Sequence, residues 1–300
     1  MNILVAFNDG YTMPTKVMLR SLITNNQDEE LSIYVLFLNL TEESIQSISE
    51  LSNGNEVEIH FVKIDDDMSY LPIPRYYSKE AYIRLFAHSY LDKDMDRILW
   101  LDGDMIIQGS LKEYYNQDFE DCLYIADVDP HFGKNHIKHK KLELPSEVEY
   151  VNTGVLLINL QGVRETIKNE DIVQYIIRYP ERLEYVDQDV FNGLLFKYFK
   201  RVDPEHLYNY FSDCITWKNK KYVMNNAHVI HYSSIFKPWE KGYRFYGFRL
   251  WWDYALIDNN NLKKLYFSIL PSYIKGFSAH CIGNVLKNRC PGIYKRLKKI

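Results

Sequence analysis

The stretch that decides the fold reads Ile98-Leu99-Trp100-Leu101-Asp102-Gly103-Asp104-Met105-Ile106-Ile107. Its two apolar runs predict buried strands, and the carboxylates between them are costly to bury unless a cation compensates them. Residues i and i+2 of an extended backbone point to the same side, so Asp102 and Asp104 can converge on one ion, while Gly103 leaves room for a ligand. Mg²⁺ or Mn²⁺ bound together with phosphate oxygens suits such a pair. A solvated turn between two strands is the alternative for the triplet alone.

The first third of the chain alternates strand-like and helix-like runs. The strand-like runs are residues 3–7, 32–38 and 57–64, and the helix-like runs are residues 14–23 and 42–51. This βαβαβ pattern predicts a largely parallel sheet with helices on both faces, whose ligands bind beyond the carboxyl ends of the strands. The loop Asn8-Asp9-Gly10-Tyr11 lies at such an end, and a helical pattern over 79–90 places Arg84 near the same edge.

The middle of the chain carries further polar groups beside apolar runs. Asp129 closes a short strand, and the basic segment 136–141 that follows is expected to be an exposed loop. The apolar run 155–160 predicts a strand preceded by Tyr150-Val151-Asn152-Thr153-Gly154. Asp187-Gln188-Asp189 begins a predicted helix, where acidic side chains complement the helix dipole.

A histidine and a lysine follow a late strand-like run. His231 ends the run Val229-Ile230-His231, and Lys237 lies in the loop that continues to Trp239. The imidazole could complete a metal site with the two carboxylates, and the lysine could neutralise a phosphate. Taken alone, His231 fits a hydrogen-bonded loop histidine better than a metal ligand.

Length and composition predict a folded globular protein. The chain has 300 residues and is 46% hydrophobic, which is enough for a substantial core. Its four cysteines are scattered without a CxxC pair, so free thiols in a reducing compartment are expected. We expect neither a secretion signal nor a transmembrane helix, because the N-terminus lacks a basic region and no apolar run approaches the ~18 residues of a membrane span.

Charge is distributed unevenly along the chain. The segment after Asp258 has nine Lys and Arg residues and no Asp or Glu. Because the net charge of the whole chain is −4, the part before this segment has a net charge of −13. Because apolar and aromatic residues interleave with these cations, the segment 259–300 is expected to associate with an anionic membrane surface rather than with nucleic acid. An ordinary solvated pair of terminal helices is the alternative. We place the boundary between a domain of residues 1–258 and this tail near residue 258.

The order and spacing of the motifs resemble the family 8 glycosyltransferases, most closely the bacterial lipopolysaccharide and lipooligosaccharide hexosyltransferases, over about residues 1–245. The resemblance implies an α/β GT-A fold, a Rossmann-like αβα sandwich with a mixed, mostly parallel sheet, here followed by the basic C-terminal helical tail. The motifs that carry it are Tyr82-Ile83-Arg84-Leu85, Asp102-Gly103-Asp104, Asn152-Thr153-Gly154, Asp187-Gln188-Asp189 and His231 to Trp239.

The resemblance also implies a role for each matched residue. Asp102, Asp104 and His231 would ligate Mn²⁺ or Mg²⁺, and Lys237 would hold the diphosphate of a nucleotide sugar, beside Gly103 and Ser234. The donor hexose would lie among Arg84, Asp129, Asn152, Gly154, Asp187 and Gln188. Tyr11 would stack on uracil, and the backbone of Ala6 and Asn8 would read its edge. Relatives often have an acid in place of Asn8 and a glycine in place of Ser234, and a side chain at the second position could shift the loop.

The implied reaction transfers glucose or galactose from UDP to a glycan or glycolipid acceptor with retention of configuration. Gln188 stands where a nucleophile has been proposed and is a poor one, so front-side attack is favoured, with Asp187 as the alternative nucleophile. Asp189 could be a helix-terminal acid with no catalytic role. The expected setting is the cytoplasmic face of the cell membrane, in the synthesis of cell-surface polysaccharide.

Other functions share parts of this pattern. A sugar-1-phosphate nucleotidyltransferase is disfavoured because no glycine-rich, basic loop follows the first strand. A self-glucosylating primer of the glycogenin kind has many candidate acceptors among the 25 tyrosines. A nucleotide-sugar-binding protein with decayed activity is disfavoured by the intact Asp102, Asp104, His231 and Lys237.

Overall fold

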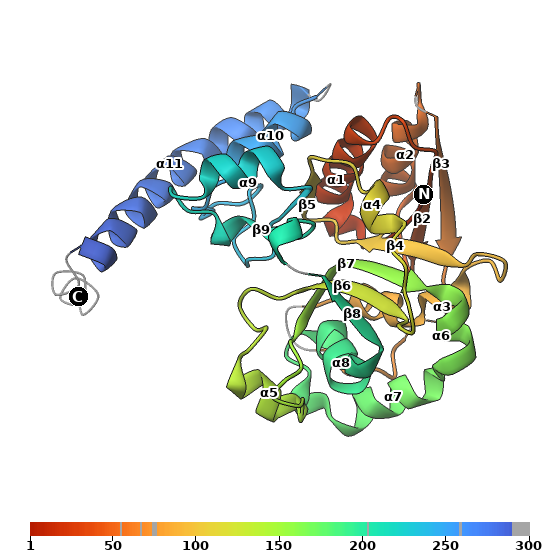
Figure 1. Cartoon of the computed structure of the whole chain (residues 1–300). Coiled ribbons are helices and arrows are strands. Elements are labelled where there is room, and N and C mark those ends of the chain that lie inside the picture. Colours follow the sequence, from red (N-terminus) through yellow and green to blue (C-terminus); the bar gives the residue numbers. More distant parts are fainter. Residues whose placement is uncertain (55, 67, 74–76, 203, 258–259, 290–300) are drawn as a thin grey trace.

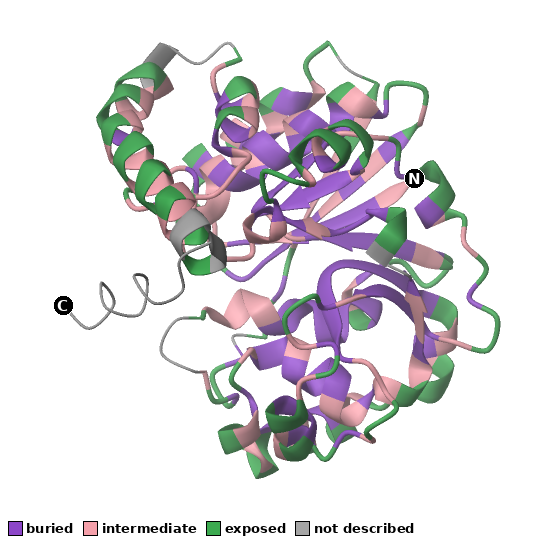
Figure 2. Ribbon diagram, turned by 60° about the vertical axis from the view of Figure 1, so that its left-hand side comes forward, coloured by how far each residue is buried: buried purple, intermediate pink, exposed green. Residues whose placement is uncertain are grey.

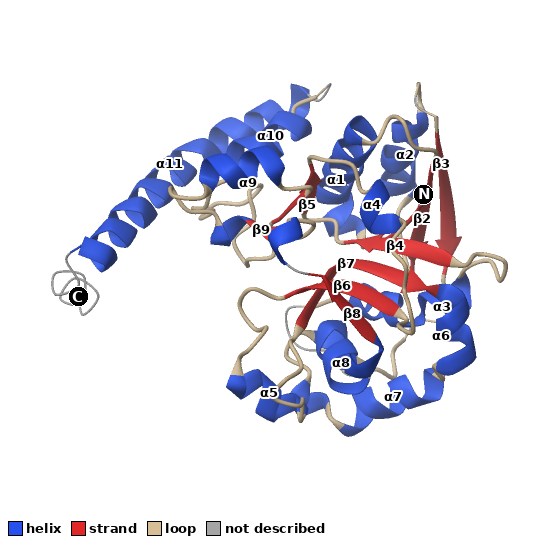
Figure 3. Ribbon diagram, viewed as in Figure 1, coloured by secondary structure: helices blue, strands red, loops and turns tan. Residues whose placement is uncertain are grey.

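The computed structural model describes residues 1–289 apart from residues 55, 67, 74–76, 203 and 258–259. Within these residues the strands form one seven-stranded sheet and one three-stranded sheet (Figure 1, Figure 3). The strands are β1 (Asn2–Ala6), β2 (Leu31–Phe37), β3 (Val57–Lys63), β4 (Arg97–Leu101), β6 (Tyr124–Val128), β7 (Val151–Asn159) and β8 (Phe199–Val202) in the large sheet, and β5 (Met105–Ile107), β9 (Tyr210–Phe211) and β10 (Val229–His231) in the small one.

Helices cover both faces of the large sheet (Figure 3). The α-helices are α1 (Thr12–Asn25), α2 (Glu42–Ser49), α3 (Ala87–Tyr90), α4 (Lys112–Tyr115), α5 (His136–Leu142), α6 (Leu160–Thr166), α7 (Asn169–Arg178), α8 (Val186–Leu194), α9 (Lys220–Asn226), α10 (Phe248–Ala255) and α11 (Asn260–Arg289). Short 3-10 helices are η1 (Asp9–Tyr11), η2 (Glu50–Ser52), η3 (Lys79–Phe86), η4 (Pro180–Arg182), η5 (Phe196–Tyr198), η6 (Pro204–His206) and η7 (Ser212–Cys214).

The large sheet is mixed and mostly parallel. Its strand order is β3-β2-β1-β4-β7-β6-β8, and β7 is the one described strand of this sheet that runs antiparallel to its neighbours. The carboxyl ends of the other strands therefore share one edge of the sheet, and the first residues of β7 lie at that edge too. This arrangement confirms the predicted α/β GT-A architecture. It also brings the polar residues that follow the strands together at one edge of the sheet.

Two hydrophobic layers follow from the alternation of side chains along the strands. Ile98 and Trp100 of β4 pack into the layer beneath α6 and α8, whereas Leu99 and Leu101 pack into the layer beneath α1 and α2. These residues are at most 2% exposed, and the purple strands of Figure 2 show the same burial along the sheet. An apolar run buried on both faces is typical of a central strand of such a sheet.

A third apolar cluster joins the small sheet to α9, α10 and α11. Ile269 of α11 is buried there, and the ring of Tyr273 stacks on Phe248 of α10 with centroids 4.0 Å apart. In Figure 1 the helix runs along α10 and then projects beyond it. One face of α11 is therefore part of the folded body. Residues 290–300 of the predicted tail, together with 258–259, lie outside the described residues.

The expected exposed loop at 136–141 is wrong. These residues form helix α5, because Asn135 caps its first turn by accepting hydrogen bonds from the backbone of Ile137 and Lys138. Lys138 and His139 are buried. The ammonium group of Lys138 is paired with Asp189, and the ring nitrogens of His139 are hydrogen-bonded to backbone oxygens. The basic composition of this segment therefore wrongly indicated an exposed loop, whereas the segment is a helix that packs one face against the protein.

Two expectations about the chain as a whole can be compared with the structure. Within residues 1–289, gaps excepted, no helix combines the length and the apolarity that a membrane span needs. Cys122, Cys214 and Cys281 are free thiols, as expected, while Cys290 lies outside the described residues.

Candidate active site

The predicted site residues gather at the edge of the large sheet where the parallel strands end. Asp102 follows β4 and Asp129 follows β6, while Asn152 and Gly154 lie in the first residues of β7. The register fixes this meeting, since Leu101 pairs with Val155 and Val128 pairs with Val151. The backbone N–H of Asp102 also donates to Gly154 O at 2.9 Å.

The small sheet brings the distant histidine to the same place. In the antiparallel pair of β10 and β5, His231 lies opposite Met105, and the N–H of Tyr232 donates to Asp104 O at 2.9 Å. The Asp102-Gly103-Asp104 triplet thus connects a strand of the large sheet to a strand of the small one. A Cβ on Gly103 would lie 2.4 Å from Thr15 Oγ1, so a larger residue does not fit at this junction.

Three ligand atoms converge between the two sheets. His231 Nε2 lies 3.3 Å from Asp104 Oδ1 and 3.8 Å from Asp102 Oδ2. Together these atoms form a group in which every pair lies within 4.8 Å. Two carboxylates and one imidazole form a donor set that Mn²⁺ accepts, so the residues fit the predicted metal.

Each carboxylate of this group has its other oxygen held by a cation. Asp102 Oδ1 accepts from Trp100 Nε1 at 2.8 Å and pairs with Arg84 Nη2 at 2.8 Å. Asp104 Oδ2 accepts from Lys237 Nζ at 2.6 Å. Burial opposes ionisation of Asp104, but the positive charge of Lys237, together with the contact of the carboxylate with the His231 ring, outweighs it and lowers the pKa of this carboxyl.

The imidazole is oriented in the same way. His231 Nδ1 lies 3.0 Å from Asn209 Oδ1, and Asn209 Nδ2 in turn donates to Asn152 Oδ1 at 2.8 Å. Because an amide oxygen can only accept, Nδ1 carries the proton and Nε2 keeps its lone pair for a metal. The three atoms left available are therefore Asp102 Oδ2, Asp104 Oδ1 and His231 Nε2.

Hydrogen bonds continue from the metal ligands into the predicted sugar pocket. Asn152 Nδ2 donates to Gln188 Oε1 at 2.8 Å, and Gln188 Nε2 donates to Tyr150 Oη at 3.1 Å and to Asp129 Oδ2 at 3.5 Å. Burial raises the pKa of Asp129, against the opposing effect of backbone N–H donors. The Gln188 amide is therefore fixed on both sides, and it is connected to His231 by hydrogen bonds through Asn152 and Asn209.

Arg84 connects the metal ligands to the other pocket carboxylate. Its Nε lies 3.0 Å from Asp187 Oδ2, its Nη1 donates to Thr153 O at 2.6 Å, and its guanidinium covers the ring of Trp100 at 4.3 Å. Burial raises the pKa of Asp187 to about 7 even though Arg84 opposes this effect. Removing one partner of such a buried pair typically costs about 3–5 kcal/mol, because the other charge stays buried.

The start of α8 is strained where Asp187 enters the pocket. Val186 is fully buried and has φ +46°, which is a strained conformation for a β-branched residue. Beneath it, Asp189 accepts from Lys138 Nζ at 2.8 Å and from Tyr150 Oη at 2.7 Å. Asp189 is therefore the buried anchor of Lys138 and Tyr150, and this explains its place in the Asp-Gln-Asp motif.

The expected nucleoside loop lies beside the metal group. The half-buried ring of Tyr11 packs edge-on against Trp239 with centroids 6.0 Å apart. Burial raises the pKa of Tyr11, and the charges of Asp104 and Asp102 add to the effect. The Asn8 side chain accepts from Gly10 N at 3.1 Å, and Ser234 Oγ accepts from Phe236 N at 3.3 Å. These two side chains thus stabilise their own loops.

Three residues of the site were not predicted from the sequence. Asn209 orients His231, Tyr150 joins Gln188 to Asp189, and Lys138 neutralises Asp189. Tyr150 lies two residues before Asn152 of the Asn152-Thr153-Gly154 motif and could have been suspected from its position. Asn209 and Lys138 lie in stretches of sequence that have no motif.

Comparisons with known proteins show which family this chain resembles. The sequence profile described as "Glycosyl transferase family 8" matches residues 2–242. Lipopolysaccharide 1,2-glucosyltransferase of Escherichia coli K12 is 26% identical over 80% of this chain and 73% of the relative. Lipopolysaccharide 1,3-galactosyltransferase of Salmonella typhimurium is 24% identical over 79% and 72%. The crystal structure of the galactosyltransferase LgtC with donor and acceptor sugar analogues matches with a TM-score of 0.76 at 22% identity, over 88% of this chain and all of that one.

We predict that Gly154→Ala weakens binding of Mn²⁺ at least about tenfold, because even outer contacts of metal ligands are typically worth that much. A Cβ at this position would lie 2.5 Å from His231 Cε1 and 2.9 Å from Asp102 Oδ2. Titration followed by the electron paramagnetic resonance of free Mn²⁺ measures the affinity.

The matched control is Gly162→Ala in α6, whose Cβ would crowd Leu123 at 2.7 Å far from the ligand atoms. It should lose stability but keep the affinity for Mn²⁺. Unchanged affinity in Gly154→Ala would contradict the assigned ligand atoms.

Proposed function

The chain belongs to glycosyl transferase family 8 and is a glycosyltransferase of the GT-A fold, and from this premise we propose that it transfers glucose or galactose from UDP to a glycan or glycolipid acceptor. The transfer would retain the anomeric configuration and depend on Mn²⁺. The observation that carries the proposal is the convergence of Asp102 Oδ2, Asp104 Oδ1 and His231 Nε2. In each of these side chains the other polar atom is held by a neighbouring group, which is Arg84, Lys237 or Asn209.

Transfer requires the diphosphate to accept charge as the anomeric bond breaks. A divalent cation held by Asp102, Asp104 and His231 would stabilise that charge as a Lewis acid. Lys237 donates to the carboxylate of Asp104 and also to Tyr232 O at 2.7 Å, so its ammonium group is held beside the proposed metal site. In this proposal its ammonium group donates to a phosphate oxygen of the leaving nucleotide, so that no protonating carboxylic acid is needed.

The sugar pocket supports positioning by Gln188 rather than covalent attack. Gln188 Oε1 accepts from Asn152 Nδ2 and from the N–H of Thr153, and the side chain carries no charge. Asp187 Oδ2 pairs with Arg84 and accepts from Thr153 Oγ1 at 3.3 Å. A carboxylate held in this way is a weak nucleophile, so we propose front-side attack, with Asp187 and Gln188 binding sugar hydroxyls.

The nucleoside would bind at the end of β1. Tyr11 presents an aromatic ring beside Trp239 and close to the metal group, which supports stacking on uracil. The backbone of Ala6 and Asn8 lies at the carboxyl end of the strand, where sheets of this kind bind nucleotides.

We also propose that α11 places the enzyme on an anionic membrane surface at the cytoplasmic face. One face of the helix packs on α10, whereas Phe267, Ile274 and Ile282 are 65%, 55% and 60% exposed. The exposed Lys264 and Lys275 lie along the same side of the helix. The membrane contact is therefore narrower than composition indicated, since Tyr266, Ile269 and Tyr273 pack against the protein.

We predict Mn²⁺-dependent release of UDP from UDP-glucose or UDP-galactose without acceptor. Asp104→Asn should slow this hydrolysis about 100-fold or more, since losing one group that stabilises developing charge typically costs that much. Release of UDP is followed with a coupled assay, and intact-mass measurement of the same samples detects self-glucosylation. We expect no mass increase.

The matched control is Asp127→Asn, an equally isosteric change at a carboxyl whose pKa burial raises to about 8 beside Tyr114. It should keep wild-type turnover. Full turnover of Asp104→Asn would refute the metal assignment, and failure to release UDP from either donor would favour a decayed binding protein.

We predict that the double variant Phe267→Ser and Ile274→Ser binds phosphatidylglycerol vesicles about tenfold more weakly or worse, because two apolar side chains no longer enter the lipid. Vesicle co-sedimentation measures the binding. Point variants are preferable to deletion of the helix, which would uncover Trp252 and Phe248.

Trp217→Ser is the control for this comparison, because Trp217 is 68% exposed but lies outside α11. It should bind vesicles as the wild type does. Equal binding by the double variant and this control would show that α11 is not the membrane contact.

A further inference from the structure

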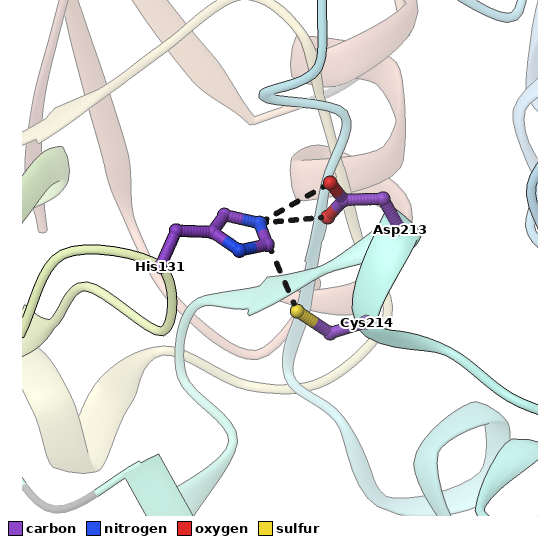
Figure 4. Close-up of side chains that lie close together, drawn as sticks. All are labelled: His131, Asp213 and Cys214. Carbon is purple, nitrogen blue, oxygen red and sulfur yellow. Dashed lines mark hydrogen bonds and ion pairs between the residues drawn. The ribbon is translucent and has the colours of Figure 1, made fainter.

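A second cluster of potential metal ligands lies outside the residues assigned to the donor. His131 follows β6, while Asp213 and Cys214 lie in η7 after β9 (Figure 4). His131 Nε2 lies 3.2 Å from Asp213 Oδ2, 3.3 Å from Asp213 Oδ1 and 3.9 Å from Cys214 Sγ. One ring nitrogen therefore faces an oxygen donor and a sulfur donor together.

The cluster is open to solvent on one side. The side chains of His131 and Asp213 are 43% and 21% exposed, and Cys214 is half-buried. An ion can thus reach the ligand atoms without rearrangement of the core.

We propose that His131, Asp213 and Cys214 form a second metal site, which takes a borderline-soft divalent cation of the Zn²⁺ kind. Imidazole, carboxylate and thiolate are the ligands that Zn²⁺ takes in proteins, and three of them leave a fourth position for water. Tetrahedral Zn²⁺ would separate the nitrogen from the oxygen by about 3.4 Å and from the sulfur by about 3.6 Å. The distances in the structure lie within a few tenths of an ångström of these values.

The chemistry of this cluster separates it from the Asp102, Asp104 and His231 group. That group offers two carboxylates and one imidazole, which suit Mn²⁺, whereas the thiol of Cys214 suits a softer ion. Binding would replace the proton on His131 Nε2 and the thiol proton of Cys214, and both protons would pass to solvent. The two sites should therefore hold different metals at the same time.

A bound ion would connect two segments at the rim of the sugar pocket. The N–H of His131 donates to Asp129 Oδ1 at 2.9 Å, so the loop that carries the ligand also orients the pocket carboxylate. Phe211 lies between the sites, with its ring 5.6 Å from that of His131 and 5.2 Å from that of His231. The ion would act as a clamp between the loop after β6 and the segment after β9, next to the metal group.

The inference does not depend on the transfer reaction, so it is tested in the Asp104→Asn protein, in which the first metal group is disabled. A calorimetric titration of this protein with Zn²⁺ should show one binding site per chain. Co²⁺ in its place should give the intense charge-transfer absorption of a thiolate ligand. Introducing the substitution Cys214→Ser into the Asp104→Asn protein should weaken Zn²⁺ binding at least about tenfold, because even the loss of a group that contacts a metal ligand typically lowers metal affinity by that factor. The same substitution should abolish the charge-transfer absorption of the Co²⁺ complex.

Two more variants make the outcome decisive. Asp213→Asn keeps the thiol and should also lose at least about tenfold in affinity. Cys122→Ser alters a free thiol elsewhere and should change neither affinity nor spectrum. Equal Zn²⁺ affinity with and without Cys214, or a Co²⁺ complex that lacks thiolate absorption, would overturn the proposal.

Discussion

The structure depends on the compensation of two neighbouring carboxylates, one buried and one partly exposed, by the guanidinium of Arg84. This one cation contacts Asp102 of the triplet at 2.8 Å and Asp187 of the sugar pocket at 3.0 Å, and it donates to the carbonyl of Thr153. Arg84 is itself only 9% exposed, and its charge opposes the effect of burial on Asp187, which disfavours the ionised carboxylate. The planar fork of arginine can satisfy three such partners in fixed directions, which an ammonium group could not do.

The same compensation leaves the proposed metal-ligand atoms free. Arg84 and Lys237 each hold one oxygen of a carboxylate, and Asn209 holds the far nitrogen of His231, so the second atom of each side chain points to a shared space. The ligands come from both sheets, because the triplet connects them. A movement of the small sheet against the large one would therefore alter the geometry of the proposed ligand atoms, and the hydrogen bonds from Asn209 through Asn152 to Gln188 would carry that change into the proposed sugar pocket.

Sequence patterns predicted the parts of the fold that have a period or a motif. The strands β1, β2 and β4 follow from short apolar runs, and the carboxylates of the triplet follow from their cost of burial. The helix α5 was missed because its basic residues lack an apolar stripe, and its burial depends on an ion pair with Asp189, 51 residues away. Asn209 was missed for a related reason. Its role arises from the pairing of β9 with β10, which no local pattern encodes.

The central claim is that Asp102, Asp104 and His231 bind the metal that makes the nucleotide a leaving group. It is tested most directly by crystals grown with Mn²⁺ and UDP, with anomalous scattering recorded at the manganese edge. We predict one strong peak within coordination distance, about 2.0–2.3 Å, of Asp102 Oδ2, Asp104 Oδ1 and His231 Nε2, with diphosphate oxygens completing the shell. A peak that lies elsewhere, or bound UDP without a manganese peak at these atoms, would contradict the account.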